Sequence, residues 1–165
     1  CTGSGCIGLA LAHSVESARV TLAEISEPAL RVAKQNTANL RLKNRVTAFS
    51  VDVLQPAPKF LGQFDLIVSN PPYVTTKEMA TLDVSVWAYE PHLALEGGED
   101  GLDFYRAILQ NFSAALRPGG TICFEFGCGQ ETGVGELLEA AGFTDMLFRK
   151  DLRGVTRAVA ARKPE

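Results

Sequence analysis

The sequence Asn70-Pro71-Pro72-Tyr73 restricts the possible folds of this chain more than any other stretch. It follows an apolar run, 64–69, that has the length and composition of a β-strand. The prolines end that strand because they have no backbone N–H, and each holds the residue before it out of the helical region. The sequence therefore predicts a stiff turn with outward polar groups at a strand end, which is where open α/β sheets bind ligands.

Strand-like and helix-like segments alternate along the whole chain. We expect strands over 19–25, 46–51, 64–69, 121–126, 143–149 and 155–162. We expect helices over 6–15, 27–42, 102–116 and 131–141, the third closed by Pro118-Gly119-Gly120. This order predicts one α/β domain with a mainly parallel sheet, helices on both faces and an antiparallel strand near the C-terminus. The long segment 75–100 has little periodicity, which favours a functional lid or binding loop.

Composition excludes several classes of function. With a net charge of −3, the chain lacks the excess of Lys and Arg expected of an autonomous nucleic-acid binder. No apolar run is long enough for a membrane span. The cysteines fit none of the usual zinc spacings, so we expect reduced thiols in an intracellular protein, with a disulfide as the alternative. The histidines have no metal-like partners, and we expect no metal site. The cysteines are Cys1, Cys6, Cys123 and Cys128, and the histidines are His13 and His92.

The stretch from Gly3 to Gly8 matches the dinucleotide fingerprint G-x-G-x-x-G, and Glu24 follows at the distance of a ribose-binding acid. Glycines let a cofactor approach backbone N–H groups, and a carboxylate at the next strand end can accept from two ribose hydroxyls. The alternative is that Gly5 and Gly8 only allow tight helix-on-sheet packing and that Glu24 is a solvated charge. We favour a cofactor site because the strand ends that carry these residues converge on one crevice.

Asp52 and Asn70 end two further strands. Asp52 is a candidate acceptor for an exocyclic amine on a cofactor base, although a turn-initiating or capping aspartate is nearly as plausible. Asn70 considered alone is consistent with an ordinary turn residue. The two prolines and the tyrosine that follow it favour a ligand-binding site instead. The opening glycine-rich turn normally follows a strand, so we expect a fragment whose upstream residues were removed or not recorded.

Several motifs together resemble the release-factor glutamine methyltransferases of the HemK/PrmC type, and the resemblance covers essentially the whole chain. The motif Asn70 to Tyr73 is shared with adenine methyltransferases, whereas the segment from Tyr89 to Leu102 narrows the match. The other matching motifs are Thr2-Gly3-Ser4-Gly5, Tyr89-Glu90-Pro91, Ala94-Leu95, Gly97-Gly98, Asp100-Gly101-Leu102 and Glu125-Phe126-Gly127 with Gln130.

The resemblance implies a class I, Rossmann-like fold that uses S-adenosylmethionine to methylate the glutamine amide in the Gly-Gly-Gln motif of peptide chain release factors. It also implies a first strand and an N-terminal helical substrate-binding domain, both missing here, and a cytoplasmic protein. Glu24 stands where the family usually has aspartate, and Cys1 where it often has glycine. The implied cofactor residues are Thr2, Gly3 and Gly5 for the methionine part, Glu24 for the ribose, Asp52 with Val53 for the adenine, and in addition Cys1, Ser4 and Asn70.

For the substrate, we expect the Asn70 side-chain oxygen and the Pro71 carbonyl each to accept one N–H of the glutamine amide, with Pro72 completing the turn and Tyr73 packed beside the amide plane. The first alternative is an adenine-N6 methyltransferase acting on an extruded base. The acidic charge and the lack of a Lys/Arg cluster near the motif oppose it. A nicotinamide-dependent dehydrogenase would explain only the glycines, and a non-catalytic cofactor-binding domain is the third alternative.

Overall fold

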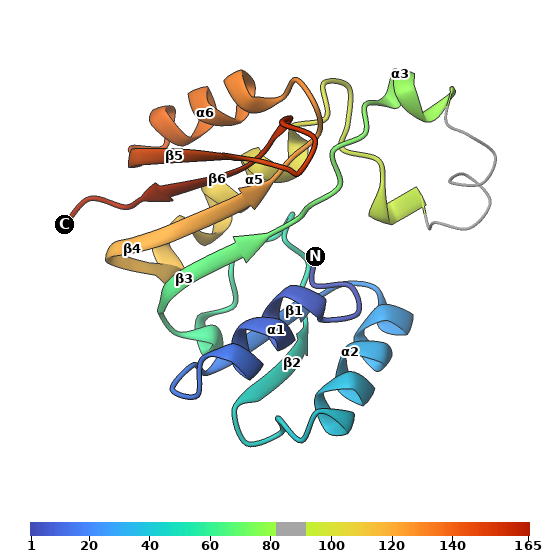
Figure 1. Cartoon of the computed structure of the whole chain (residues 1–165), viewed down its shortest axis with the longest axis vertical. Coiled ribbons are helices and arrows are strands. Elements are labelled where there is room, and N and C mark those ends of the chain that lie inside the picture. Colours follow the sequence, from blue (N-terminus) through green and yellow to red (C-terminus); the bar gives the residue numbers. More distant parts are fainter. Residues whose placement is uncertain (82–91) are drawn as a thin grey trace. The chain divides into compact units, whose positions relative to one another are not determined.

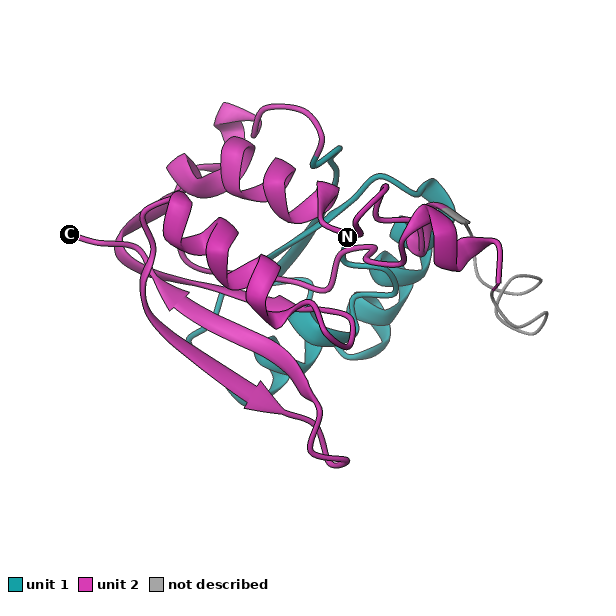
Figure 2. Cartoon of the chain, turned by 90° about the horizontal axis from the view of Figure 1, so that it is seen from above, with its two compact units in different colours: residues 1–53 teal, residues 54–165 magenta. Residues whose placement is uncertain are grey.

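The computed structural model describes residues 1–81 and 92–165. Tyr89, Glu90 and Pro91, which carry part of the family resemblance, lie outside the described residues. The chain consists of two compact units, residues 1–53 and 54–165, shown in different colours in Figure 2. Each unit has its own sheet.

The first unit is a β-α-β arrangement preceded by a helix. Its elements are α1 (Cys6–Ser14), β1 (Val20–Glu24), α2 (Glu27–Asn39) and β2 (Val46–Ser50). The two strands are parallel, in a register that pairs Val20 with Val46 and Glu24 with Ser50. Both helices contact the sheet and each other (Figure 1). The core is formed by apolar residues from all four elements and the turn before β2, among them Leu9, Ala12, Leu22, Ala33, Leu42 and Val46.

Helix α2 begins where the sequence predicts. The Ser26 hydroxyl accepts from the Ala29 N–H at 3.5 Å, and Pro28 occupies the first turn, where its missing N–H costs nothing. The helix ends at Asn39, earlier than predicted, because the chain turns at Arg41, which has a left-handed φ of 57°. Its buried residues are Leu30, Ala33 and Thr37, whereas Leu40 follows the helix and is exposed.

The second unit contains a four-stranded mixed sheet of order β3-β4-β6-β5. The pair β3–β4 is parallel, whereas β6 is antiparallel to both β4 and β5, which confirms the predicted C-terminal strand (Figure 1). Its elements are η1 (Lys59–Leu61), β3 (Phe64–Ser69), α3 (Thr76–Met79), η2 (His92–Ala94), α5 (Asp103–Phe112), η3 (Ser113–Ala115), β4 (Leu116–Glu125), α6 (Glu131–Ala140), β5 (Thr144–Lys150) and β6 (Thr156–Arg162).

The strands form two sheets rather than the one sheet that the sequence predicts. Among the described residues, β1 pairs only with β2, and β3 pairs only with β4. β1 and β3 each have one paired neighbour among the described residues, so each is an edge strand of its own sheet.

The boundary between α5 and β4 differs from the prediction. The helix ends at Phe112, and Leu116 already pairs with Phe64 in the sheet. Pairing resumes between Thr121 and Leu66, so the predicted closing turn 117–120 is an irregular stretch inside β4. Leu116 is completely buried at the start of β4. The buried face of α5 consists of Tyr105, Ile108, Leu109 and Phe112.

A short helix, α3, lies in the segment that the sequence predicts as a loop. Its start is a capping box: the Thr75 hydroxyl accepts from the Glu78 N–H at 3.2 Å, and the Glu78 carboxylate accepts from the Thr75 N–H at 3.0 Å. The Thr75 hydroxyl also donates to the Glu78 carboxylate at 2.8 Å, and this bond, with a smaller contribution from the Thr75 N–H, lowers the pKa of Glu78. The Thr-x-x-Glu spacing is the sequence signal for this helix.

Candidate functional site

The glycines at the start of the first unit differ in their surroundings: some are closely packed, and one has open space beside it. A Cβ added at Gly8 would lie 2.5 Å from Leu22 Cδ2, so Gly8 is required for α1 to approach β1. Gly5 has a φ of 85° and would bring a Cβ to 3.0 Å from Leu9, so it too serves packing. By contrast, a Cβ on Gly3, with φ of 56°, would meet no atom within 4 Å. Only Gly3 therefore leaves room for a ligand.

Glu24 is not the solvated charge that the alternative interpretation supposed. It is 7% exposed at the end of β1. One carboxylate oxygen accepts from the Gly3 N–H at 2.8 Å and the other from the Ser26 N–H at 2.9 Å. Because each carboxylate oxygen has two lone pairs, both oxygens keep acceptor capacity for a ligand hydroxyl. The sequence predicted Gly3 and Glu24 in one site, and the structure brings them together.

The other predicted cofactor residues of this unit lie at the same end of its sheet. The Val51 N–H donates to the Glu24 carbonyl at 3.1 Å, so the chain enters Asp52 and Val53 directly beside the end of β1. The backbone N–H groups of Cys1 and Thr2 both donate to the Ala23 carbonyl, at 2.9 and 3.1 Å. These contacts fix the loop backbone on both sides of Glu24.

Ser4 is exposed, and its carbonyl accepts from the Asn36 side chain at 3.0 Å. In this unit the open Gly3 thus contacts the Glu24 carboxylate directly, and backbone hydrogen bonds of Cys1, Thr2 and Val51 hold the adjoining loops at the same end of β1. Such a set fits a cofactor that carries a ribose, because a buried carboxylate at a strand end binds vicinal hydroxyls and the glycine backbone admits the adjoining group.

In the second unit, Asn70 to Tyr73 form the predicted turn directly after β3. Pro71 and Pro72 are buried, Tyr73 is half-buried, and Asn70 is exposed. Both peptide bonds that precede the prolines are trans. The Asn70 side chain makes no hydrogen bond to any described residue. A rigid backbone therefore presents an amide whose oxygen is available as an acceptor.

Glycines pack directly against this turn. A Cβ on Gly97 would lie 2.8 Å from the Pro72 carbonyl oxygen and 2.8 Å from Tyr73 Cα. The segment around Gly97 is hydrogen-bonded to Val74, the residue that follows the turn. The Val74 N–H donates to the Leu95 carbonyl, and the Gly97 N–H donates to the Val74 carbonyl. The segment 95–98 thus holds the turn in place, which explains the Gly97-Gly98 pair.

Two residues beside Tyr73 were not identified from the sequence. The Arg157 guanidinium carbon lies 5.9 Å from the centre of the Tyr73 ring. The Tyr105 hydroxyl donates to the Glu125 carbonyl at 2.8 Å, and burial, with smaller contributions from Tyr73 and Glu125, strongly raises the pKa of Tyr105. Tyr105 therefore stays neutral and serves as a donor. Both residues come from distant strands and helices, so no local sequence signal marks them.

An ion pair anchors the loop that follows Gly98. The Arg106 guanidinium pairs with Asp100 and, at 3.1 Å, with Asp103. The hydrogen bond from Arg106 lowers the pKa of Asp100 to about 2. Asp100 also accepts from the Leu102 N–H at 3.0 Å, so the pair fixes the loop at the start of α5.

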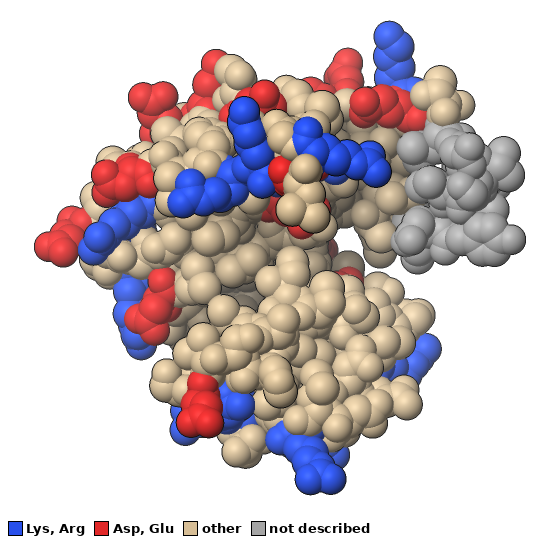
Figure 3. Space-filling model, viewed as in Figure 1, with Lys and Arg blue, Asp and Glu red and all other residues tan. Residues whose placement is uncertain are grey.

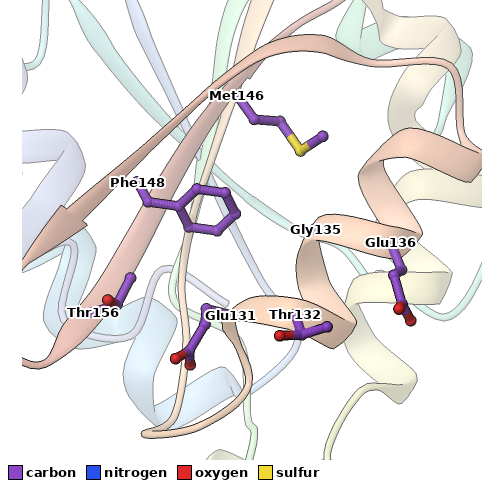
Figure 4. A pocket seen from close by; sticks show the side chains of 7 residues that line it. All are labelled: Glu131, Thr132, Gly135, Glu136, Met146, Phe148 and Thr156. Atoms are coloured by element: carbon purple, nitrogen blue, oxygen red, sulfur yellow. The ribbon is translucent and has the colours of Figure 1, made fainter.

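A cavity of about 320 Å³ lies between α6 and the strands β5 and β6, outside both sets of predicted residues. Figure 4 shows Met146 and Phe148 on one side of it and Glu131, Thr132 and Glu136 on the other. It is open and shallow and contains no residue of the predicted site.

The remaining expectations concern metals and membranes. All four cysteines are free thiols. No group of metal-ligating side chains occurs among the described residues. In residues 1–81 and 92–165, no helix is long and apolar enough to cross a membrane.

Comparison with known proteins finds a matching family model and several similar methyltransferases. Residues 1–88 match the family model "Methyltransferase small domain". A release factor glutamine methyltransferase of Clostridium acetobutylicum is 42% identical over 161 residues, which cover 98% of this chain and 56% of that protein. One of Cereibacter sphaeroides is 42% identical over 163 residues, covering 99% and 58%. The chain thus spans little more than half the length of these relatives.

Solved structures support the fold. A crystal structure of a methyltransferase from Pyrococcus furiosus matches with a TM-score of 0.69 at 17% identity, covering 99% of this chain and 72% of that one. The likeness confirms the predicted class I methyltransferase fold.

Proposed function

Because this chain belongs to the methyltransferase small domain family, we propose that it uses S-adenosylmethionine to methylate the side-chain amide nitrogen of a glutamine. The observation that carries this proposal is the exposed Asn70 amide on a turn whose two prolines are buried. We propose that the glutamine belongs to the Gly-Gly-Gln motif of peptide chain release factors. The names of relatives at about 42% identity support that substrate. Such a substrate would place the protein in the cytoplasm.

The residues of the first unit fit the cofactor. Glu24 would accept from the ribose hydroxyls, Asp52 and Val53 would bind the adenine, and the loop from Cys1 to Gly5 would admit the methionine part beside open Gly3. When bound, S-adenosylmethionine supplies an electrophilic methyl group on a sulfonium that leaves as a neutral thioether. We also assign Asn70 to the cofactor contacts, as the resemblance implies.

The residues of the second unit would hold the substrate amide. An amide nitrogen is a weak nucleophile because its lone pair is delocalised into the carbonyl, so orientation has to compensate. The Asn70 side-chain oxygen and the Pro71 carbonyl would each accept one amide N–H. The nitrogen would then be fixed with its free face toward the methyl group.

The same two acceptors favour positive charge as it develops on the nitrogen. The proton that the nitrogen loses afterwards passes to water, so no strong base is required. Tyr73, with Arg157 on its ring, would pack beside the amide plane and exclude water from it.

Charge opposes the adenine alternative. On the face shown in Figure 3, Lys and Arg side chains lie among Asp and Glu side chains, and no continuous basic stripe of the kind that a nucleic-acid groove has crosses it. The test is a competition in which the full natural chain is incubated with methyl-labelled cofactor, a release factor and adenine-containing nucleic acid. We expect label only in the release factor, and none when its Gly-Gly-Gln glutamine is changed to glutamate. Label in the nucleic acid would replace this proposal with the adenine alternative.

A further inference from the structure

The side chain of Gln130 connects the turn Asn70 to Tyr73, here called the substrate turn, to two other loops. It is the N-cap residue of α6 and is half-buried. Its oxygen accepts from the Gly127 N–H at 2.8 Å, and its nitrogen donates to the Tyr73 carbonyl at 3.0 Å and toward the Gly101 carbonyl at 3.4 Å. The side chain therefore joins the loop after β4, the turn after β3 and the loop before α5.

Only a primary amide satisfies all of these groups. The backbone N–H of Gly127 can only donate, and the carbonyls of Tyr73 and Gly101 can only accept. A side chain between them must accept on one side and donate on the other. A glutamate would satisfy Gly127 but would turn a second acceptor toward two carbonyls, and an apolar residue would leave all three groups without this partner.

The surrounding backbone is shaped to the Gln130 amide. A Cβ on Gly101, which has a φ of 75°, would collide with the Gln130 nitrogen and the Tyr73 carbonyl oxygen. A Cβ on Gly127 would lie 2.8 Å from the Gln130 oxygen and 3.0 Å from Tyr73 Cδ2. Close packing on both sides leaves Gln130 one arrangement.

We propose that Gln130 is a positioning residue that sets the orientation of the Asn70 to Tyr73 turn. By holding the Tyr73 carbonyl, it fixes the peptide that joins Tyr73 to Val74 at the end of the turn, and with it the direction of the Asn70 and Pro71 acceptors. This inference rests on the proposed methyl transfer. A shift of about 1 Å in such acceptors costs on the order of 100-fold in rate.

The first test is Gln130→Glu, with Gln110→Glu on the exposed surface of α5 as the matched control. In the full natural chain at about pH 8, we expect kcat to fall about 100-fold. The KM for release factor should change less than about 3-fold, because substrate contacts elsewhere are intact. Facing carbonyls raise the pKa of the introduced carboxyl, and its protonated form can donate to Tyr73. The ratio of variant to parent kcat should therefore rise as the pH is lowered to about 5.5.

The second measurement does not depend on activity. Amide hydrogen exchange at Gly127 should stay slow in Gln130→Glu, where an acceptor remains, and become faster in Gln130→Met, where none does. A Gln130→Glu variant that keeps the parent kcat, or whose kcat ratio does not change with pH, would overturn the positioning role. Unchanged Gly127 exchange in Gln130→Met would overturn it too, even if the variant were inactive. If the unmodified chain transfers no methyl group to release factor, the proposed function fails instead, and the exchange result still stands.

Discussion

At the scale of residues, the two predicted sites are built in opposite ways. Glu24 is buried, and both of its oxygens are already used by backbone N–H groups. Asn70 is exposed on a rigid turn and has no hydrogen-bond partner among the described residues. Glu24 therefore supports its loop in addition to its proposed role in cofactor binding, whereas for Asn70 we propose ligand binding alone. Substitutions at the two positions should separate stability from chemistry.

Replacing Glu24 by alanine should affect both binding and stability. The variant loses two hydrogen bonds to a charged acceptor, each worth about 1.5–3 kcal/mol, and leaves the Gly3 and Ser26 N–H groups without that acceptor. We expect weaker S-adenosylmethionine binding in calorimetry and a lower thermal midpoint. Glu27→Ala, on the exposed first turn of α2, is the control. Unchanged cofactor affinity in Glu24→Ala would remove Glu24 from the ribose site.

At the scale of elements, helix packing depends on where glycines lie. Gly8 and Gly135 are both helical, but a Cβ on Gly8 meets Leu22 at 2.5 Å, whereas one on Gly135 meets Phe148 at an ordinary 3.4 Å. The first glycine allows close approach of α1 to β1, and the second has room for a side chain. The difference gives a matched pair of substitutions.

Gly8→Ala should lower the free energy of unfolding by about 1–3 kcal/mol, because overpacking moves α1 away from β1. Gly135→Ala should raise it by about 0.5–1 kcal/mol, since alanine loses less entropy than glycine in a helix. Urea unfolding of both variants measures the two effects. Equal effects of the two substitutions would contradict the packing described for α1.

The ion pair between Asp100 and Arg106 gives a pH dependence at the start of α5. The folded-state pKa of Asp100 is about 2, below its ordinary 3.8, so its contribution is complete above about pH 4 and disappears as the pH falls toward 2. Because both groups are largely exposed, we expect less than about 1 kcal/mol. Urea unfolding should show Asp100→Asn less stable than the parent at about pH 6, with the difference lost near pH 2. Glu99→Gln is the control, and a difference that persisted at low pH would exclude the ion pair as its cause.

The sequence predicted most of these elements but not all of their boundaries. Short apolar runs predicted the strands of the described residues, and the predicted start of α2 at residue 27 was correct. The start of β4 at Leu116 was missed because it depends on pairing with Phe64, 52 positions away. The helix α3 was missed although its capping box is present in the sequence. Arg157 and Tyr105 were missed as neighbours of Tyr73 because only tertiary structure brings them there.

At the scale of the whole molecule, the chain has two units with separate sheets and separate predicted roles. The first contains the proposed cofactor residues around Glu24, and the second contains the turn Asn70 to Tyr73 that we propose binds the substrate. The family match excludes the nicotinamide-dependent dehydrogenase that the glycine fingerprint also allowed. The glycines themselves were ambiguous in the sequence, because packing and ligand approach require the same residue. The structure separates them, assigning Gly5 and Gly8 to packing and leaving Gly3 open.

The central claim is that the Asn70 amide orients a glutamine for methyl transfer. The most direct measurement compares Asn70→Ala with the parent in the full natural chain, by mass spectrometry of the release-factor peptide that contains Gly-Gly-Gln. Cofactor affinity and thermal midpoint are measured alongside. We expect at least about a 100-fold loss of methylated glutamine, with the thermal midpoint and most of the cofactor affinity preserved. Methylation within a few-fold of the parent would contradict the account.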